Sequence, residues 1–219
     1  MSTWRHTATH GVAWVDSITP GRAEMAAASP IWPMQITAPG AAQPESGQVQ
    51  LVSGEYFRVL RQRPQIGRLL GPNDNRTLGQ RPVAVISDGY FRRTFDRSPD
   101  VLGRTLVING APVTIVGVAA PGFFGTTLKN NNADVWMPVM MQADIRYAGN
   151  RASHNGDDLK PWPPQREIEW LNIFVRVPAG NVVEVAEGMT LALQRDYRLR
   201  IGYNDDTERA NGTRQPGSG

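Results

Sequence analysis

The chain has 219 residues, of which 40% are hydrophobic and 20% charged, and this composition predicts a folded chain of one large domain or two closely joined small ones. It contains no cysteine, which excludes disulfide scaffolds, thiol catalysis and cysteine-ligated zinc. The net charge is only +3, and although residues 51–104 hold ten arginines against five acids, no basic run exceeds two residues, so nucleic-acid binding is not expected.

Neither the apolar runs nor the N-terminal residues predict membrane insertion. No stretch reaches the about 18 consecutive apolar residues of a membrane-spanning helix. Residues 1–9 are polar and are not followed by the apolar block of a secretory signal. We therefore expect a soluble, thiol-free domain.

The first predicted elements are two strands and a short helix. Within a segment rich in Ala, Pro and Gly, residues 34–37 predict a short strand. The alternation of polar and apolar residues at 48–52 predicts a half-buried strand. Residues 54–62 predict a helix with Ser53 as its N-cap, because apolar residues before the cap and inside the helix have the spacing of a hydrophobic staple.

A second strand and helix follow in the chain. The compact apolar run at 82–86 predicts a buried strand, and Ser87 predicts the N-cap of a helix over 88–96. The two phenylalanines of this helix lie four residues apart, on one face, so Arg92 and Arg93 are expected to point away from that face.

The clearest local signal is a β-hairpin. Residues 105–108 and 113–118 are β-prone and flank Asn109-Gly110, a pair that readily takes the positive φ angles of a tight type I′ turn. Residues 134–139 predict a further strand, which we expect either to lie at an edge of the sheet or to end at its proline.

The last third of the chain predicts one long loop and a few short elements. The loop covers residues 143–166, and a strand follows at 168–177. Residues 182–196 predict a helix, because their apolar residues recur with a period of about 3.6. A last strand is predicted at 198–203, before a polar tail at 204–219.

Few residues are candidates for chemistry. Ser87 lies at a strand–turn–helix junction, the setting of a hydrolase nucleophile, but that turn needs glycine two residues earlier, where Val85 stands. Nothing in the sequence pairs Ser87 with His154, so the N-cap role is favoured. His6 and His10 have the spacing of two metal ligands on a helix, but no third ligand lies nearby, so neither a metal nor a cofactor is predicted.

A series of short motifs over about ninety residues resembles a known family. In chain order the motifs are LVSGEYF at 51–57, GRLL at 67–70, PVAVIS at 82–87, VLGRTL at 101–106, ING at 108–110, VTIVGV at 113–118, PGF at 121–123 and DVWMP at 134–138. Their order and spacing are similar to those of the MacB-like periplasmic core domain of ABC transporter permeases of the MacB, FtsX and LolE type, in particular of the branch abundant in acidobacteria.

The resemblance implies an α+β fold in two parts. A porter-like α/β layer would be built from both chain ends, residues 1–50 and 166–203, and a mostly β, sabre-like subdomain from residues 51–165. Residues 204–219 would remain a polar tail. The linker-like end Pro216-Gly217-Ser218-Gly219 favours a domain excised from a longer chain over a truncated gene product.

The resemblance also implies a location and partners. The domain would lie on the periplasmic side of the bacterial inner membrane, between two transmembrane helices of the parent permease. ATP would be hydrolysed by a separate cytoplasmic ATPase, so the domain itself is expected not to be an enzyme and to need no cofactor. A periplasmic adaptor or a lipoprotein is the expected partner outside the membrane.

Three functions follow as hypotheses. The first is a non-catalytic domain that couples transmembrane motion to a substrate or partner protein, with Arg92, Arg93, Phe123 and Phe124 as the candidate partner surface. The second is a soluble serine hydrolase using Ser87. The third is a ligand-binding sensor with a pocket between its two subdomains.

Overall fold

The computed structural model of the chain describes residues 23–126, 132–149, 152–153, 157, 159–163, 165, 168–178, 180–188 and 190–191. The described residues fall into two compact units, one containing Glu24–Arg176 and the other the residues from Val177 onward. None of the helices in this described part is both long and apolar enough to cross a membrane. His6, His10, His154 and the elements predicted at 198–203 and 204–219 lie outside the described residues.

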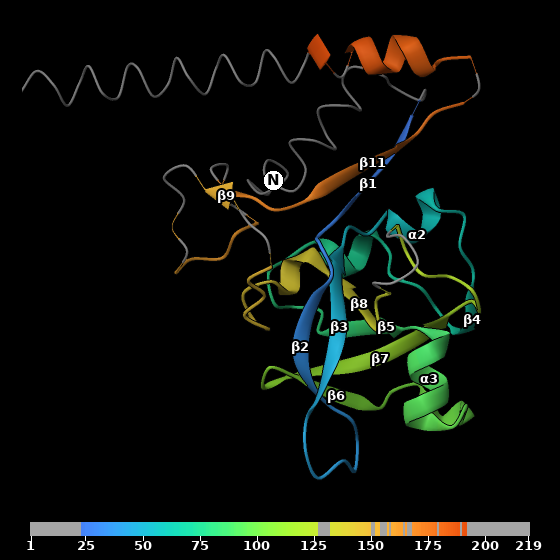
Figure 1. The fold of residues 1–219 in the computed structure, drawn as a ribbon, viewed down its shortest axis with the longest axis vertical. Helices are drawn as coiled ribbons and strands as arrows, with labels where there is room; N and C mark the ends of the chain where they lie inside the picture. Colours follow the sequence, from blue (N-terminus) through green and yellow to red (C-terminus); the bar gives the residue numbers. More distant parts are fainter. Residues whose placement is uncertain are drawn as a thin grey trace, which may run out of the picture. The chain divides into compact units, whose positions relative to one another are not determined.

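The first unit is built on a mixed sheet of nine strands (Figure 1). A separate two-stranded sheet pairs β9 (Ala152–Ser153) with β10 (Ile168–Glu169). β9 lies within the loop predicted at 143–166, and β10 lies at the start of the strand predicted at 168–177. The strands of the main sheet are β1 (Glu24–Ala28), β2 (Trp32–Thr37), β3 (Glu45–Val52), β4 (Pro64–Gly67), β5 (Val83–Ile86), β6 (Thr105–Ile108), β7 (Ala111–Ala119), β8 (Val135–Pro138) and β11 (Asn172–Arg176).

Six of these strands close into a ring. The order β3-β2-β6-β7-β5-β8 returns to its start because β8 pairs antiparallel with β5 and parallel with β3. β4 adds to the end of β7. β1 and β11 pair antiparallel along their whole length and join the ring through Ala28, which pairs with Val52.

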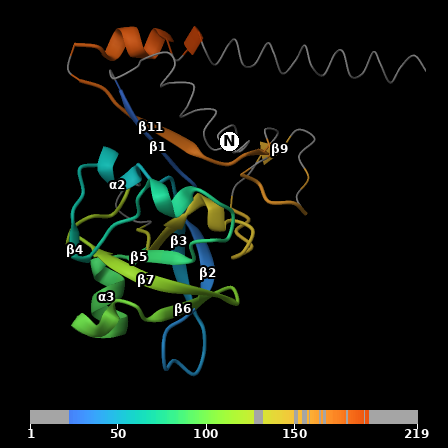
Figure 2. The same cartoon turned by 180° about the vertical axis from the view of Figure 1, so that it is seen from behind.

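Few helices accompany the strands. α2 (Tyr56–Val59) follows β3, and α3 (Asp88–Phe95) follows β5 and lies beside β7 (Figure 2). Short 3-10 turns are η2 (Pro72–Asn75), η3 (Pro99–Val101) and η4 (Val139–Met141). In the second unit, residues 182–188 and 190–191 are helical, and Val185 is buried. The predicted α+β class is confirmed.

β8 is buried on both faces, and because alternate side chains of a strand point to opposite sides, its residues enter two different cores. In β8, Val135 and Met137 join the larger hydrophobic core, which α3 also enters with its aromatic side chains. Trp136, between them in sequence, joins a second core beneath α2. The first core fills the ring, and the second lies outside it, under α2 and β1.

The predicted β6–β7 hairpin is confirmed in detail. Asn109 and Gly110 form its turn with φ of 47° and 90°. The predicted strands at 34–37, 48–52 and 82–86 correspond to β2, β3 and β5.

Of the two alternatives for the strand at 134–139, the structure has the second. β8 is not an edge strand: it lies between β3 and β5 and is fully buried. It ends at its proline, because Pro138 is its last residue and the ladder stops there.

Ser53 is not the N-cap of α2, which begins after Glu55 and has four residues instead of the nine predicted. The Ser53 hydroxyl instead accepts a hydrogen bond from the backbone N–H of Ala27, at 3.0 Å, so the tertiary contact with β1 takes the oxygen that a local cap would use.

The division into a porter-like layer and a sabre-like subdomain remains a prediction. β3 runs through the predicted boundary between residues 50 and 51, and both β2 and β3 belong to the ring. The pairing of β1 with β11 brings the two predicted parts of the porter-like layer side by side.

Candidate partner surface

Arg92 and Arg93 lie on α3, whose start is fixed by a side-chain cap. The Ser87 hydroxyl accepts a hydrogen bond from the backbone N–H of Tyr90 at 3.0 Å, which satisfies one of the unpaired donors of the first turn. Tyr90 and Phe91 are buried in the larger core, so the two arginines face outward, as predicted.

Both arginines are neutralised by nearby carboxylates. Arg92 lies 3.3 Å from Asp88 on the preceding turn of α3, and Arg93 lies 2.8 Å from Asp134, just before β8. The Arg93 guanidinium also lies 4.8 Å from the centre of the Tyr90 ring. About half of each arginine side chain is exposed, so each pair is worth little to stability and leaves hydrogen-bonding capacity for a partner.

Phe123 and Phe124 differ in their burial. Phe123 packs against Trp136, with ring centres 5.2 Å apart, and against Phe57 at 5.6 Å. Phe124 is 50% exposed. Of the two, only Phe124 offers an apolar contact to a partner, and Phe123 anchors the loop that carries it.

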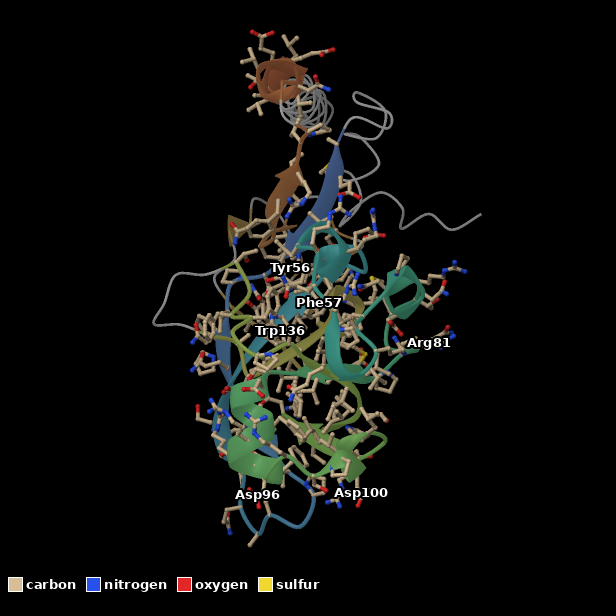
Figure 3. All side chains as sticks on the ribbon, turned by 90° about the vertical axis from the view of Figure 1, so that its right-hand side faces the viewer. Tyr56, Phe57, Arg81, Asp96, Asp100 and Trp136 are labelled. Carbon is tan, nitrogen blue, oxygen red and sulfur yellow. The ribbon has the colours of Figure 1, made fainter. Side chains whose placement is uncertain are left out.

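A buried polar network lies beneath this loop. The Gln50 side-chain oxygen accepts a hydrogen bond from the Trp136 indole at 3.0 Å, and its amide nitrogen donates to the Ser29 carbonyl at 2.9 Å. Gly125 covers the network closely: a Cβ there would lie 3.0 Å from the Tyr56 hydroxyl. Figure 3 shows Tyr56, Phe57 and Trp136 gathered in the same part of the unit. Burial raises the pKa of Tyr56, despite its hydrogen bonds, so the phenol stays neutral.

The two halves of the predicted surface belong to different cores. α3 packs with its aromatic side chains into the core inside the ring, whereas Phe123 packs into the core beneath α2. The grouping of Arg92, Arg93, Phe123 and Phe124 into one partner surface therefore remains a proposal.

The hydrolase hypothesis finds no support at Ser87. Its side chain is buried and its oxygen serves as the helix cap, while His154 lies outside the described residues. Within the described ranges, no group of three or more His, Asp or Glu side chains could hold a metal ion.

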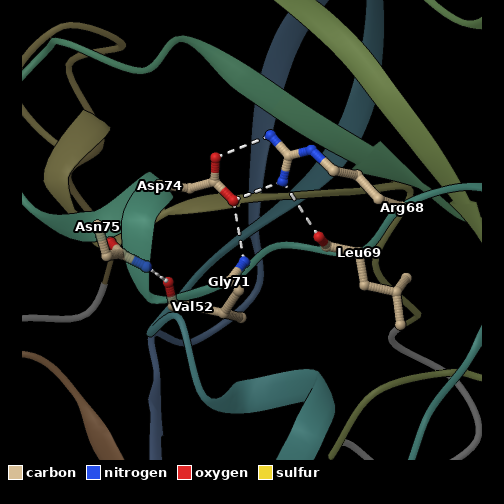
Figure 4. A network of polar contacts seen from close by, with 6 residues as sticks. All are labelled: Val52, Arg68, Leu69, Gly71, Asp74 and Asn75. Atoms are coloured by element: carbon tan, nitrogen blue, oxygen red, sulfur yellow. Dashed lines mark hydrogen bonds and ion pairs between the residues drawn. The ribbon is translucent and has the colours of Figure 1, made fainter.

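A salt bridge between Arg68 and Asp74 fixes the segment between β4 and β5, and the sequence did not predict it (Figure 4). Asp74 is buried and accepts from both Arg68 guanidinium nitrogens, at 2.7 and 2.9 Å, and from the Gly71 amide at 2.9 Å. Burial alone would raise the pKa of Asp74, but these hydrogen bonds and the Arg68 charge hold it below its usual value. Asn75 next to it donates to the Val52 carbonyl at 3.0 Å, which ties the turn to β3.

A surface groove of about 530 Å³ was also not predicted. It lies where β2 meets β6 and is lined by residues that include Gln35, Thr37, Val107, Asn109 and Arg146. Its residues are separated by up to about a hundred positions in the sequence, so no local pattern brings them together.

The architecture has counterparts among solved structures. The extracellular domain of the noncanonic ABC-type transporter YknZ from Gram-positive bacteria matches with a TM-score of 0.60 at 14% identity, over 86% of this chain and 82% of that one. The periplasmic region of MacB from Actinobacillus actinomycetemcomitans matches with a TM-score of 0.56 at 14% identity, over 82% and 72%. At 14% identity both likenesses are in fold alone, and the fold is one that extracytoplasmic domains of ABC-type transporters also have.

Sequence comparison then gives the family. The model described as the MacB-like periplasmic core domain matches residues 8–190, so the chain belongs to this family. The chain is also 34% identical over 106 residues to the macrolide export ATP-binding/permease protein MacB of Burkholderia thailandensis. That match covers 46% of this chain but 15% of the relative. The family expected from the motif series is confirmed.

Proposed function

We propose that this domain is a non-catalytic element of an ABC transporter permease that couples transmembrane motion to a substrate or partner protein outside the membrane. The observation that carries the proposal is the β1–β11 ribbon. Glu24, which begins β1, is paired with Arg176, which ends β11, so the two ends of the segment Glu24–Arg176 lie side by side. Motion of the two flanking segments would therefore act on the unit through one place, the Glu24–Arg176 end of the ribbon, which we call its root.

Contacts at this root support transmission of motion into the ring. Both carboxylate oxygens of Glu24 are used: Arg58 lies 2.7 Å from one and Arg61 2.7 Å from the other. Arg176 donates to the Val59 carbonyl at the end of α2. α2 in turn packs with Phe57 onto the core outside the ring. Because closely packed elements move as bodies, a displacement of the ribbon would carry the ring with it.

The rest of the proposal follows from the family. The parent permease would provide the transmembrane helices on either side of the domain, a cytoplasmic ABC ATPase would act on it indirectly, and a periplasmic adaptor or lipoprotein would be its partner. The domain would lie on the periplasmic side of the inner membrane. Arg92, Arg93 and Phe124 would contribute partner contacts, with Phe123 supporting the loop.

The test uses the parent permease with its ATPase in nanodiscs. A fluorophore on Thr105→Cys, an exposed position at the start of β6, reports energy transfer to acceptors on the lipid headgroups. We expect the transfer to differ between nucleotide-free and ATP-trapped states. Identical transfer in the two states would refute coupling.

A second comparison tests the root itself. Glu24→Gln removes both ion pairs with Arg58 and Arg61 and is expected to reduce the ATP-dependent change. Asp100→Asn, at an exposed acid in η3, is the matched control and should leave the change as it is. An equal effect of the two substitutions would exclude the root as the route of coupling.

A further inference from the structure

The groove at the junction of β2 and β6 lies on the outer face of the ring. Met34 and Ile36 of β2 are buried inside, so Gln35 and Thr37, which alternate with them, point outward and line the groove. Figure 1 shows the tip of the β6–β7 hairpin beside β2, where Asn109 contributes to the same lining.

Asn109 fixes the walls of the groove relative to one another. Its backbone N–H donates to the Gln35 carbonyl at 2.9 Å, and its side-chain oxygen accepts from the Gln35 amide at 3.2 Å. Its side-chain nitrogen donates to the Ile145 carbonyl at 3.0 Å. Next in the chain, Arg146 has a left-handed backbone, with φ of 51°, and its guanidinium donates to the Asn109 carbonyl at 3.1 Å. The groove is therefore formed before any ligand arrives.

The charge of Arg146 has no counterion in the groove. No carboxylate of the described residues lies within 4.0 Å of its guanidinium, and none of the residues that line the groove is acidic. Glu45 pairs with Ile36, whose side chain faces the core, so Glu45 shares the face opposite to Gln35, and it does not line the groove. This differs from Arg92 and Arg93, which each have a carboxylate partner.

We propose that this groove receives an acidic side chain from an exposed segment of a partner protein. The Arg146 guanidinium, which has no carboxylate partner among the described residues, offers donors to a carboxylate together with the Thr37 hydroxyl and the Gln35 side-chain amide. The groove is open to solvent, and small ligands bind in pockets that enclose most of their surface, so a segment with further contacts elsewhere fits it better. The inference rests on the proposed function, because it requires the partner protein outside the membrane that the proposed function includes.

The experiment uses the chain itself and a blocked peptide, acetyl-Gly-Val-Glu-Val-Gly-amide, followed by amide NMR shifts. We expect saturable shifts at Asn109 and Gly110 in the groove. The same peptide with glutamine in place of glutamate should give none. Equal shifts with both peptides, or no saturable shift with either, would overturn the proposal. Acetate with the same affinity as the peptide would make this a small-anion site and also overturn it.

Substitutions place the binding at Arg146. Arg146→Glu should weaken peptide binding at least tenfold. Because this change also removes the bond to Asn109, Thr37→Glu provides a second variant that places an acid in the groove and keeps that bond. Arg76→Glu, an exposed arginine after η2, is the control with the same charge change and should bind like the wild type. Retained binding in both groove variants would refute the assignment, whatever the energy-transfer experiment shows for coupling.

Discussion

At Gly117, β7 lies very close to the backbone of Arg68. Replacing Gly117 with alanine tests how much this close packing contributes to stability. A Cβ at Gly117 would lie 1.9 Å from the carbonyl oxygen of Arg68. Ordinary contacts begin near 3.4 Å, so one backbone must move by about 1.5 Å. That movement would break the hydrogen bond of 3.0 Å from the Arg68 amide to the Val116 carbonyl.

The cost combines overpacking with lost hydrogen bonding. Overpacking of a tight site costs about 1–3 kcal/mol, and each backbone hydrogen bond contributes about 0.5–1.5 kcal/mol. We therefore expect Gly117→Ala to lower the free energy of unfolding by about 3 kcal/mol, which for a chain of this size corresponds to roughly 6–12 °C in Tm.

Gly71→Ala is the matched control. Nothing lies within 4 Å of a Cβ built at Gly71, and its φ of −134° suits any residue. Both changes restrict the unfolded chain equally, so their difference isolates the contact in the folded state. Urea unfolding followed by tryptophan fluorescence gives both values. If the free energies of unfolding of Gly117→Ala and Gly71→Ala agree within about 0.5 kcal/mol, the close approach of β7 to the chain at Arg68 is not as described.

Three further substitutions have defined outcomes. Asp74→Asn should lower the free energy of unfolding by about 2 kcal/mol at pH 7. Because the pKa of Asp74 is lowered in the folded state, its contribution is complete above about pH 4 and is lost as the pH falls further. In urea unfolding the difference between variant and wild type should therefore be smaller at pH 3 than at pH 7, and an equal difference would exclude the ion pair. Ser87→Ala should lower stability by about 1 kcal/mol through loss of the cap, measured by thermal unfolding, with no change if the hydroxyl does not cap α3. Phe123→Ala should lower the free energy of unfolding by about 2 kcal/mol and Phe124→Ala by less than about 0.5 kcal/mol. Equal losses in calorimetry would contradict the packing of Phe123 and the exposure of Phe124.

Local signals in the sequence predicted local structure well. The Asn-Gly turn of β6–β7 and the Ser87 cap of α3 depend on a few neighbouring residues, and both formed as expected. Ser53 has the same chemistry as Ser87, but its hydroxyl bonds to Ala27, 26 residues away, and a contact over that distance leaves no local pattern.

The position of β8 and the candidate sites depended on such distant contacts. Pro138 suggested a strand that lies at an edge or ends at the proline, and β8 does end there. Its place between β3 and β5 was not predicted, because these neighbours come from far along the chain. Arg92 and Arg93 were correctly placed on the outer face of α3, whereas their carboxylate partners were not expected. The groove around Arg146 was missed for the same reason, since Gln35 and Asn109 meet only in the folded ring.

The closure of the ring by β8 also affects how the chain folds. Val49 pairs with Val135, so β8, the last strand of the ring in chain order, must pair with β3, more than eighty residues earlier in the sequence. Such distant pairings delay the folding transition, because the entropy of closing the intervening chain is lost before the contact is gained. During synthesis, β3 and β5 would leave the ribosome with the edges that β8 will cover still open, and the ring would close only after Pro138 has emerged.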